Sequence, residues 1–486
     1  MFKLLNPIAR WLNPITRLPN HPITRFWRAA VLAALVSACG EGGPHARAPA
    51  PALDAAAESY VRLMLALGER DADSLDTYHG PPAWQAESRT RHATLADIRT
   101  AAAALAESLA SLTTANAEDE VRRLFLIRQL RASATRIDIV LGARLPFVEE
   151  ARALFGLEGL EGQDRQDGQD RQDGQDRQDG RDRQDGREGQ VGQEAQAGQG
   201  RERREARSEL ERLLPGRGDL AARYAAFDRR FLIPRDRLPA VLSRAIEGCR
   251  AATRAHVSLP PAERVDVEYV ANLGWSAFTR YQGRFTSRIQ VNAVLPLTVD
   301  RALDLACHEA YPGHHAIDSL LEARFGGRRV ELLVRPLFSP QSLLHEAASS
   351  GAGELAFPGS ARLAFERDEL FRLAGLDPAG ADRYVRVGRL VDRLHGVQAD
   401  IARRYLDGEL DFPRASAALE RDALMPSADV TLKFLNQYRA YAATYTVGRD
   451  AFSRYLDAHG DGDRWRAYIN VVTDPSQVVP SDPSRK

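Results

Sequence analysis

Residues 307–315 read Cys307-His308-Glu309-Ala310-Tyr311-Pro312-Gly313-His314-His315. Three of the eleven histidines of this 486-residue chain fall within eight of these positions, and a glutamate directly follows the first. Imidazole nitrogens are common zinc ligands, and a glutamate beside a ligand histidine can act as general base toward a zinc-bound water. The segment therefore predicts a zinc hydrolase in which His308 is a ligand and Glu309 is the base.

The spacing of the histidines does not suit a regular helix. His314 and His315 would lie about 9 and 10.5 Å along the helix axis from His308, too far to share one zinc with bonds of ~2.1 Å. Pro312 lacks an amide hydrogen and Gly313 tolerates unusual backbone angles. We expect the helix to bulge there, absorbing two residues and bringing His314 to the second ligand position. His315 would need a larger distortion and remains the alternative ligand.

The segment from His308 to His315 resembles the HExxPGHH motif of the DUF885 family, bacterial proteins whose fold looks like that of helical zinc metallopeptidases. The resemblance implies a mainly α fold: one large helical metallopeptidase-like domain over residues 52–480, with a small β-sheet beside the active-site cleft. It also implies peptide hydrolysis. The residues alone indicate only a metal-assisted hydrolase, since the same groups would cleave other small amides or esters.

A zinc ion held by two histidines needs a third protein ligand, which leaves a fourth position for water. Glu322 and Glu331 are the next carboxylates, but Glu346 is our choice. It follows His314 by 32 residues, enough for one helix to turn back on another, and it aligns with the glutamate that opens the family's EGWALYAE-like motif. His345 is a rival that would point off the face used by Glu346.

The chain departs from the family in two places. Ala347-Ala348-Ser349-Ser350-Gly351 replaces Gly-Trp-Ala-Leu-Tyr, and the second acid, Glu354, falls one residue late. The segment 438–448 resembles the family's PGQALSYKIG-like stretch only in Tyr445-x-x-Gly448. The resemblance makes Tyr445 the candidate that stabilises an oxyanion, although Tyr438, Tyr441 and Tyr445 also have the spacing of ordinary helix packing. These departures favour the alternative of a non-catalytic envelope lipoprotein that uses the fold as a binding or scaffold module.

Residues 1–39 have the pattern of an export signal. Five basic residues and no acid precede an apolar run, Ala29 to Ala38, that is too short for a ~20-residue membrane span. The ending Leu35-Val36-Ser37-Ala38-Cys39 resembles a bacterial lipobox, with a plain secretory signal as the alternative. The resemblance implies a lipid anchor on Cys39 in a membrane and a body in the cell envelope, facing the periplasm or exterior. Residues 40–51 suit a flexible tether.

The charge composition of the chain argues against nucleic acid as a partner. Lys plus Arg equals Asp plus Glu at 66 each, so no basic excess is available to neutralise a nucleic-acid backbone. The expected partners are therefore a peptide or other small amide substrate and the membrane, with no nucleic acid. At 44% hydrophobic residues, the chain is long and apolar enough for a large core.

Periodicity predicts helices over 52–145 and 201–256. Between them, residues 162–190 form a GQDRQD repeat without an apolar residue until Val191, which predicts a disordered insertion over 158–200. Alternation at Val265, Val267 and Tyr269 indicates a strand, and 285–292 indicates another, separated by an aromatic cluster at 275–281. The strand 285–292 is either an edge that pairs with an extended substrate or a structural hairpin covering the core.

Only Cys249 and Cys307 follow the signal, 58 residues apart. They could pair in an oxidising compartment, but we expect two buried thiols. Cys307 would point about 100° away from His308 on a helix and is not expected to bind the metal.

Overall fold

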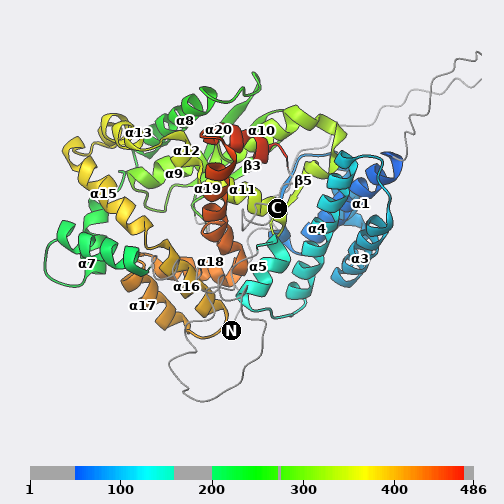
Figure 1. Ribbon diagram of the computed structural model, residues 1–486, viewed down its shortest axis with the longest axis horizontal. Helices are drawn as coiled ribbons and strands as arrows, with labels where there is room; N and C mark the ends of the chain where they lie inside the picture. Colours follow the sequence, from blue (N-terminus) through cyan, green and yellow to red (C-terminus); the bar gives the residue numbers. More distant parts are fainter. Residues whose placement is uncertain (1–49, 158–199, 272–274, 475–486) are drawn as a thin grey trace, which may run out of the picture. The chain divides into compact units, whose positions relative to one another are not determined.

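The computed structural model describes residues 50–157, 200–271 and 275–474, which all belong to one compact unit, Arg47–Lys486. The predicted signal 1–39 with Cys39 lies outside the described residues, as do positions 40–49 of the tether and 158–199 of the insertion. The described chain is mainly helical, with one two-stranded and one three-stranded sheet, which confirms the predicted fold class. Its helices are coloured in sequence order in Figure 1.

The first predicted helical segment forms five helices and a short strand. They are α1 (Ala50–Gly68), β1 (Leu75–Tyr78), α2 (Pro82–Arg91), α3 (Leu95–Ser111), α4 (Ala117–Val140) and α5 (Phe147–Phe155). α3 begins at a capping box in which Thr94 and Asp97 exchange hydrogen bonds. Tyr60, Met64 and Phe125 lie at the centre of the apolar core that α1, α3 and α4 share. The strand β1 was not expected, and α1 already includes Ala50–Pro51 of the predicted tether.

Three helices precede a three-stranded sheet. They are a helix over 200–213, α7 (Leu220–Asp228) and α8 (Leu238–Arg254). The strands of this sheet are β2 (Arg264–Val270), β3 (Ala277–Tyr281) and β4 (Thr286–Asn292), in the order β2-β4-β3. β2 runs parallel to β4, whereas β3 and β4 form an antiparallel hairpin. β4 is therefore the central strand, and the prediction that 285–292 is a substrate-pairing edge is wrong because both of its sides are paired. The aromatic cluster at 275–281 supplies β3.

The remaining chain is almost entirely helical. Its elements are α9 (Val299–Glu309), α10 (His314–Phe325), β5 (Val334–Pro336), α11 (Pro340–Ser350), α12 (Ala352–Ala356), α13 (Ser360–Phe365), a π-helix (Glu366–Leu370), α14 (Phe371–Ala374), α15 (Ala381–Asp392), α16 (His395–Leu406), α17 (Phe412–Asp422), α18 (Ala428–Tyr438), a 3-10 helix (Arg439–Thr444), α19 (Val447–His459) and α20 (Arg464–Val472). β5 pairs antiparallel with β1. None of the described helices is both long and apolar enough to span a membrane.

α11 is the helix around which the second half of the chain packs. All residues from Gln341 to Ser349 are buried, and α11 contacts α5, α9, α10, α19 and α20. In Figure 1 it lies beside the red-brown α19. A helix buried on all sides is normally apolar throughout. α11 nevertheless carries His345 and Glu346 into this interior, and buried groups of this kind need polar or metal partners.

A disulfide bond joins Cys249 of α8 to Cys307 of α9, with the two Cα atoms 5.4 Å apart. The expectation of two buried thiols is therefore wrong. Sequence alone could not pair them, because a disulfide requires only that the folded chain brings the two Cα atoms within about 7 Å. The bond fastens the helix that carries His308 to its neighbour.

Candidate metal centre

The two ligand candidates of the histidine motif come from two helices that meet at a sharp join. α9 ends at Glu309, one residue after His308, and α10 begins at His314. The join includes a cis peptide bond before Pro312. A β-carbon on Gly313 would lie 1.8 Å from the carbonyl oxygen of His308, so no side chain fits there. The predicted distortion is present and absorbs two residues, because the amides of Gly313 and Ala316 donate to carbonyls six residues back instead of four. It takes the form of a break between two helices and not of a bulge within one.

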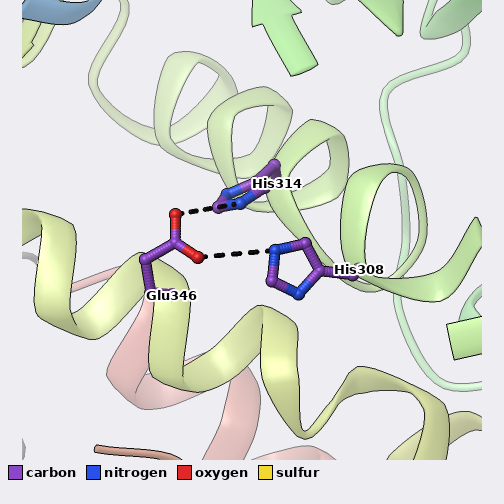
Figure 2. A group of neighbouring side chains, drawn as sticks. All are labelled: His308, His314 and Glu346. Atoms are coloured by element: carbon purple, nitrogen blue, oxygen red, sulfur yellow. Dashed lines mark ion pairs between the residues drawn. The ribbon is translucent and has the colours of Figure 1, made fainter. Parts of the chain in front are cut away.

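This join brings His308 and His314 close to one another and to Glu346 of α11. The two imidazole centroids are 4.8 Å apart, with the ring planes at 85°. Nε2 of His308 lies 3.4 Å from Oε2 of Glu346, and Nε2 of His314 lies 3.3 Å from Oε1 (Figure 2). The structure therefore brings together the three residues that the sequence predicts as ligands.

The arrangement of these three residues fits a zinc ion. Ligand atoms at ~2.1 Å in a tetrahedral site lie about 3.4 Å from one another, close to both nitrogen–oxygen distances here. One ligand atom from each residue lies within 4.8 Å of the others. Among the described residues, Oε2 of Glu346 has no hydrogen-bond partner although it is buried. Two imidazoles and one carboxylate are also the donor set of catalytic zinc sites that keep one position open.

The charge on His314 and the charge on Glu346 each change the pKa of the other group. Burial disfavours a charge on His314, but the Glu346 carboxylate outweighs it and raises the pKa of His314 to about 9. Burial likewise opposes ionisation of Glu346, and the positive charges on His314 and His308 hold its pKa well below the usual range. Because a metal ligand must be a neutral imidazole, zinc binding requires His314 to release its proton.

Two tyrosines lie against the cluster. The Tyr441 hydroxyl donates a hydrogen bond of 2.8 Å to Oε1 of Glu346. The Tyr445 ring lies 6.1 Å from the ring of His308 at an angle of 28°, and its edge faces Tyr441. Burial, with the negative charge of Glu346, raises the pKa of Tyr445 well above its usual range. Tyr445 therefore stays a neutral donor next to the cluster, as its predicted role requires.

The sequence did not identify Tyr441 as a site residue and indicated only that its spacing suits ordinary helix packing. The chain leaves α18 at Tyr438 and continues as a 3-10 helix before Tyr445, so the three tyrosines do not share one regular helix. A signal existed in the sequence, because Tyr441 stands four residues before the predicted Tyr445. A residue that orients a ligand carboxylate is expected beside a metal site.

Glu309 is 5% exposed and is the last residue of α9. It directly follows His308 in the chain, and its charge contributes to the raised pKa of both His314 and Tyr445. The Thr279 hydroxyl donates to Oε2 of this carboxylate over 2.7 Å. Sequence reasoning did not identify Thr279, which lies 30 residues earlier on an unexpected strand.

His315 does not face the cluster. Its ring is fully buried, with Nδ1 2.8 Å from the Ser287 hydroxyl and Nε2 3.1 Å from Oε2 of Glu263. Glu263 also accepts hydrogen bonds from the Tyr311 hydroxyl and from Arg250. Burial alone would raise the pKa of Glu263, but the hydrogen bonds from His315, Tyr311 and Arg250 lower it to about 2. His315 therefore anchors the join between α9 and α10, and His314 is the imidazole at the cluster.

The rival ligands are also engaged elsewhere. Nδ1 of His345 accepts a hydrogen bond of 2.7 Å from Arg335, and Glu331 pairs with Arg122 over 2.7 Å. Glu322 accepts from the backbone amide of Arg284 and from the Tyr281 hydroxyl. Each of these three side chains therefore has a hydrogen-bond or ion-pair partner outside the group of His308, His314 and Glu346.

Comparison with models of protein families and with curated proteins finds no match for this chain.

Proposed function

We propose that this protein is a zinc-dependent hydrolase of the DUF885 kind that acts on peptides or other small amides. The observation that carries the proposal is the convergence of His308, His314 and Glu346. The donor set, the spacing of its atoms and the buried Oε2 of Glu346, which has no hydrogen bond among the described residues, support zinc as the cofactor.

The chemistry divides among five residues. Zinc held by His308, His314 and Glu346 would supply a Lewis acid that lowers the pKa of a bound water. Glu309 would act as the general base that takes the proton of the attacking water and as the general acid that returns it to the leaving amine. The neutral hydroxyl of Tyr445 donates a hydrogen bond to the oxygen that becomes negative in the transition state. The proposed reaction consumes one water for each amide bond that it cleaves.

The edge of the three-stranded sheet supports a peptide as the substrate. The amide of Asn292 donates to the carbonyl of Ser276, and the amide of Gln282 donates to that of Thr286. Because backbone groups alternate in direction along an antiparallel pair, those of Ala277 point away from β4. Ala277 is partly exposed, and we propose that an extended substrate backbone pairs with β3 there.

We further infer that the protein is tethered to a membrane in the cell envelope through a lipid on Cys39. The disulfide between Cys249 and Cys307 supports an oxidising compartment, because disulfides are rare in reducing ones. Metabolic labelling with a palmitate analogue should mark the wild type and not Cys39→Ser, which should leave the membrane fraction. Equal labelling of both chains would contradict the anchor.

The proposed activity is tested with Glu309→Gln, which keeps the size of the side chain and removes its ability to accept a proton. Cleavage of a fluorogenic peptide library by the zinc-loaded protein should fall by about 100-fold or more in kcat/KM. Zinc content, measured by mass spectrometry, should stay at the wild-type value. The matched control, Glu149→Gln on the exposed side of α5, should cleave like the wild type.

Unchanged cleavage by Glu309→Gln would refute the assignment of the base. A zinc-loaded wild type that cleaves no member of the peptide library would favour the non-catalytic alternative, for which the replaced residues 347–351 are the supporting observation.

A further inference from the structure

Thr279 is a buried residue of β3 whose hydroxyl contacts Glu309 at two points. The hydroxyl oxygen lies 2.7 Å from Oε2 of the carboxylate and 2.9 Å from the main-chain carbonyl oxygen of the same residue. Thr279 is 3% exposed, so water competes little for either contact. One side chain therefore contacts both the backbone and the functional group of the predicted base.

The place of Glu309 in the chain explains why it needs such a partner. It is the last residue of α9, and carbonyl groups in the last turn of a helix have no partner within that helix. A threonine hydroxyl has one proton, shared here between the carbonyl and the carboxylate. The ionised carboxylate is the stronger acceptor, so the hydrogen bond to Oε2 dominates while Glu309 is charged.

The other oxygen of the carboxylate is left free. Among the residues that the structure describes, Oε1 of Glu309 has no hydrogen-bond partner. Glu309 directly follows the ligand candidate His308 at the end of α9. A carboxylate held through one oxygen cannot rotate freely, and its free oxygen keeps one direction.

We infer that Thr279 is a positioning residue that fixes Oε2 of Glu309 and so keeps Oε1 available to accept the proton of the attacking water. This inference rests on the proposed function, because it assigns Thr279 to the same reaction. It also explains why a polar residue occupies an inward position of β3, between Ala277 and the buried Tyr281. Valine would fill the same space but has no hydrogen to donate.

The test compares Thr279→Val, which removes the donor, with Thr279→Ser, which keeps it. In the zinc-loaded protein, Thr279→Val should lower kcat about 10- to 100-fold, the loss expected for a hydrogen bond to a charged group, while KM and zinc content stay unchanged. Thr279→Ser should stay close to the wild type. The control is Thr77→Val, a buried threonine of β1 whose hydroxyl has no partner among the described residues.

A second readout does not depend on activity. Crystal structures should show the Glu309 carboxylate turned from its wild-type position in Thr279→Val and unchanged in Thr279→Ser. The inference is wrong if Glu309 keeps its position in Thr279→Val, or if the valine and serine variants share one kcat. A wild type that binds zinc but cleaves nothing would refute the proposed function alone, and the crystal structures would still decide the role of Thr279.

Discussion

Replacing Glu263 with glutamine tests the buried network that anchors the join between α9 and α10. Burial raises the pKa of this carboxyl, but hydrogen bonds from His315, Tyr311 and Arg250 outweigh it and bring the pKa from the usual 4.5 to about 2. A fall of this size corresponds to about 3 kcal/mol of folding free energy. Glutamine keeps the shape of the side chain but cannot carry the charge that these donors stabilise.

The sign of the pH dependence follows from the direction of this pKa change. Because the pKa of Glu263 is lower in the folded chain than in the unfolded chain, its contribution is complete above about pH 4.5 and disappears as the pH falls toward about 2. Glu263→Gln should therefore be less stable than the wild type by about 3 kcal/mol at neutral pH. The difference should shrink steadily on acidification.

Urea unfolding of both chains at a series of pH values between about 7 and 3 measures this difference. The control is Glu268→Gln on β2, where the carboxylate is exposed and, within the described part of the chain, accepts a hydrogen bond from Gln290 alone. Its stability should follow the wild type at every pH. A Glu263→Gln difference that stays constant with pH, or that is absent at neutral pH, would refute the role given to the Glu263 charge.

Three further substitutions probe the helices that carry the site. The double variant Cys249→Ser/Cys307→Ser should lose about 4 kcal/mol in urea unfolding, because the bond closes a loop spanning 58 positions. Tyr441→Phe should weaken zinc binding about tenfold in calorimetry, since Glu346 loses its hydrogen bond. Gly313→Ala should lower the melting temperature and abolish zinc binding because its methyl group would overlap a carbonyl oxygen, whereas Gly388→Ala, in open space on α15, should do neither.

The two histidine ligands could be predicted from the sequence because His308 and His314 lie close together in it, whereas Glu346 was chosen from its distance along the chain and from the family resemblance. Two histidines, a glutamate and a Pro-Gly pair within eight residues require a distorted backbone if they are to share an ion. The sequence did not predict which form this distortion takes. Whether Gly313 lies in a bulge or at a break depends on how closely it packs against the backbone of His308, where an added β-carbon would lie 1.8 Å from the carbonyl oxygen, and only the folded chain reveals this.

Partners that lie far apart in the chain account for the remaining errors. β4 looked like a possible edge because its own alternation says nothing about which strands flank it. The pairing of Cys249 with Cys307 follows from the contact between α8 and α9. Thr279 and Tyr441 were missed for the same reason, since each acts on a residue that is distant in sequence.

The most direct test of the site is the zinc content of the chain. Protein stripped with a chelator and titrated with zinc in a calorimeter should bind one ion per chain. His308→Ala, His314→Ala and Glu346→Ala should each lose this binding, whereas His459→Ala, on the exposed end of α19, should keep it. A folded wild type that binds no stoichiometric zinc, or a His314→Ala variant that binds it as well as the wild type, would contradict the proposed metal centre.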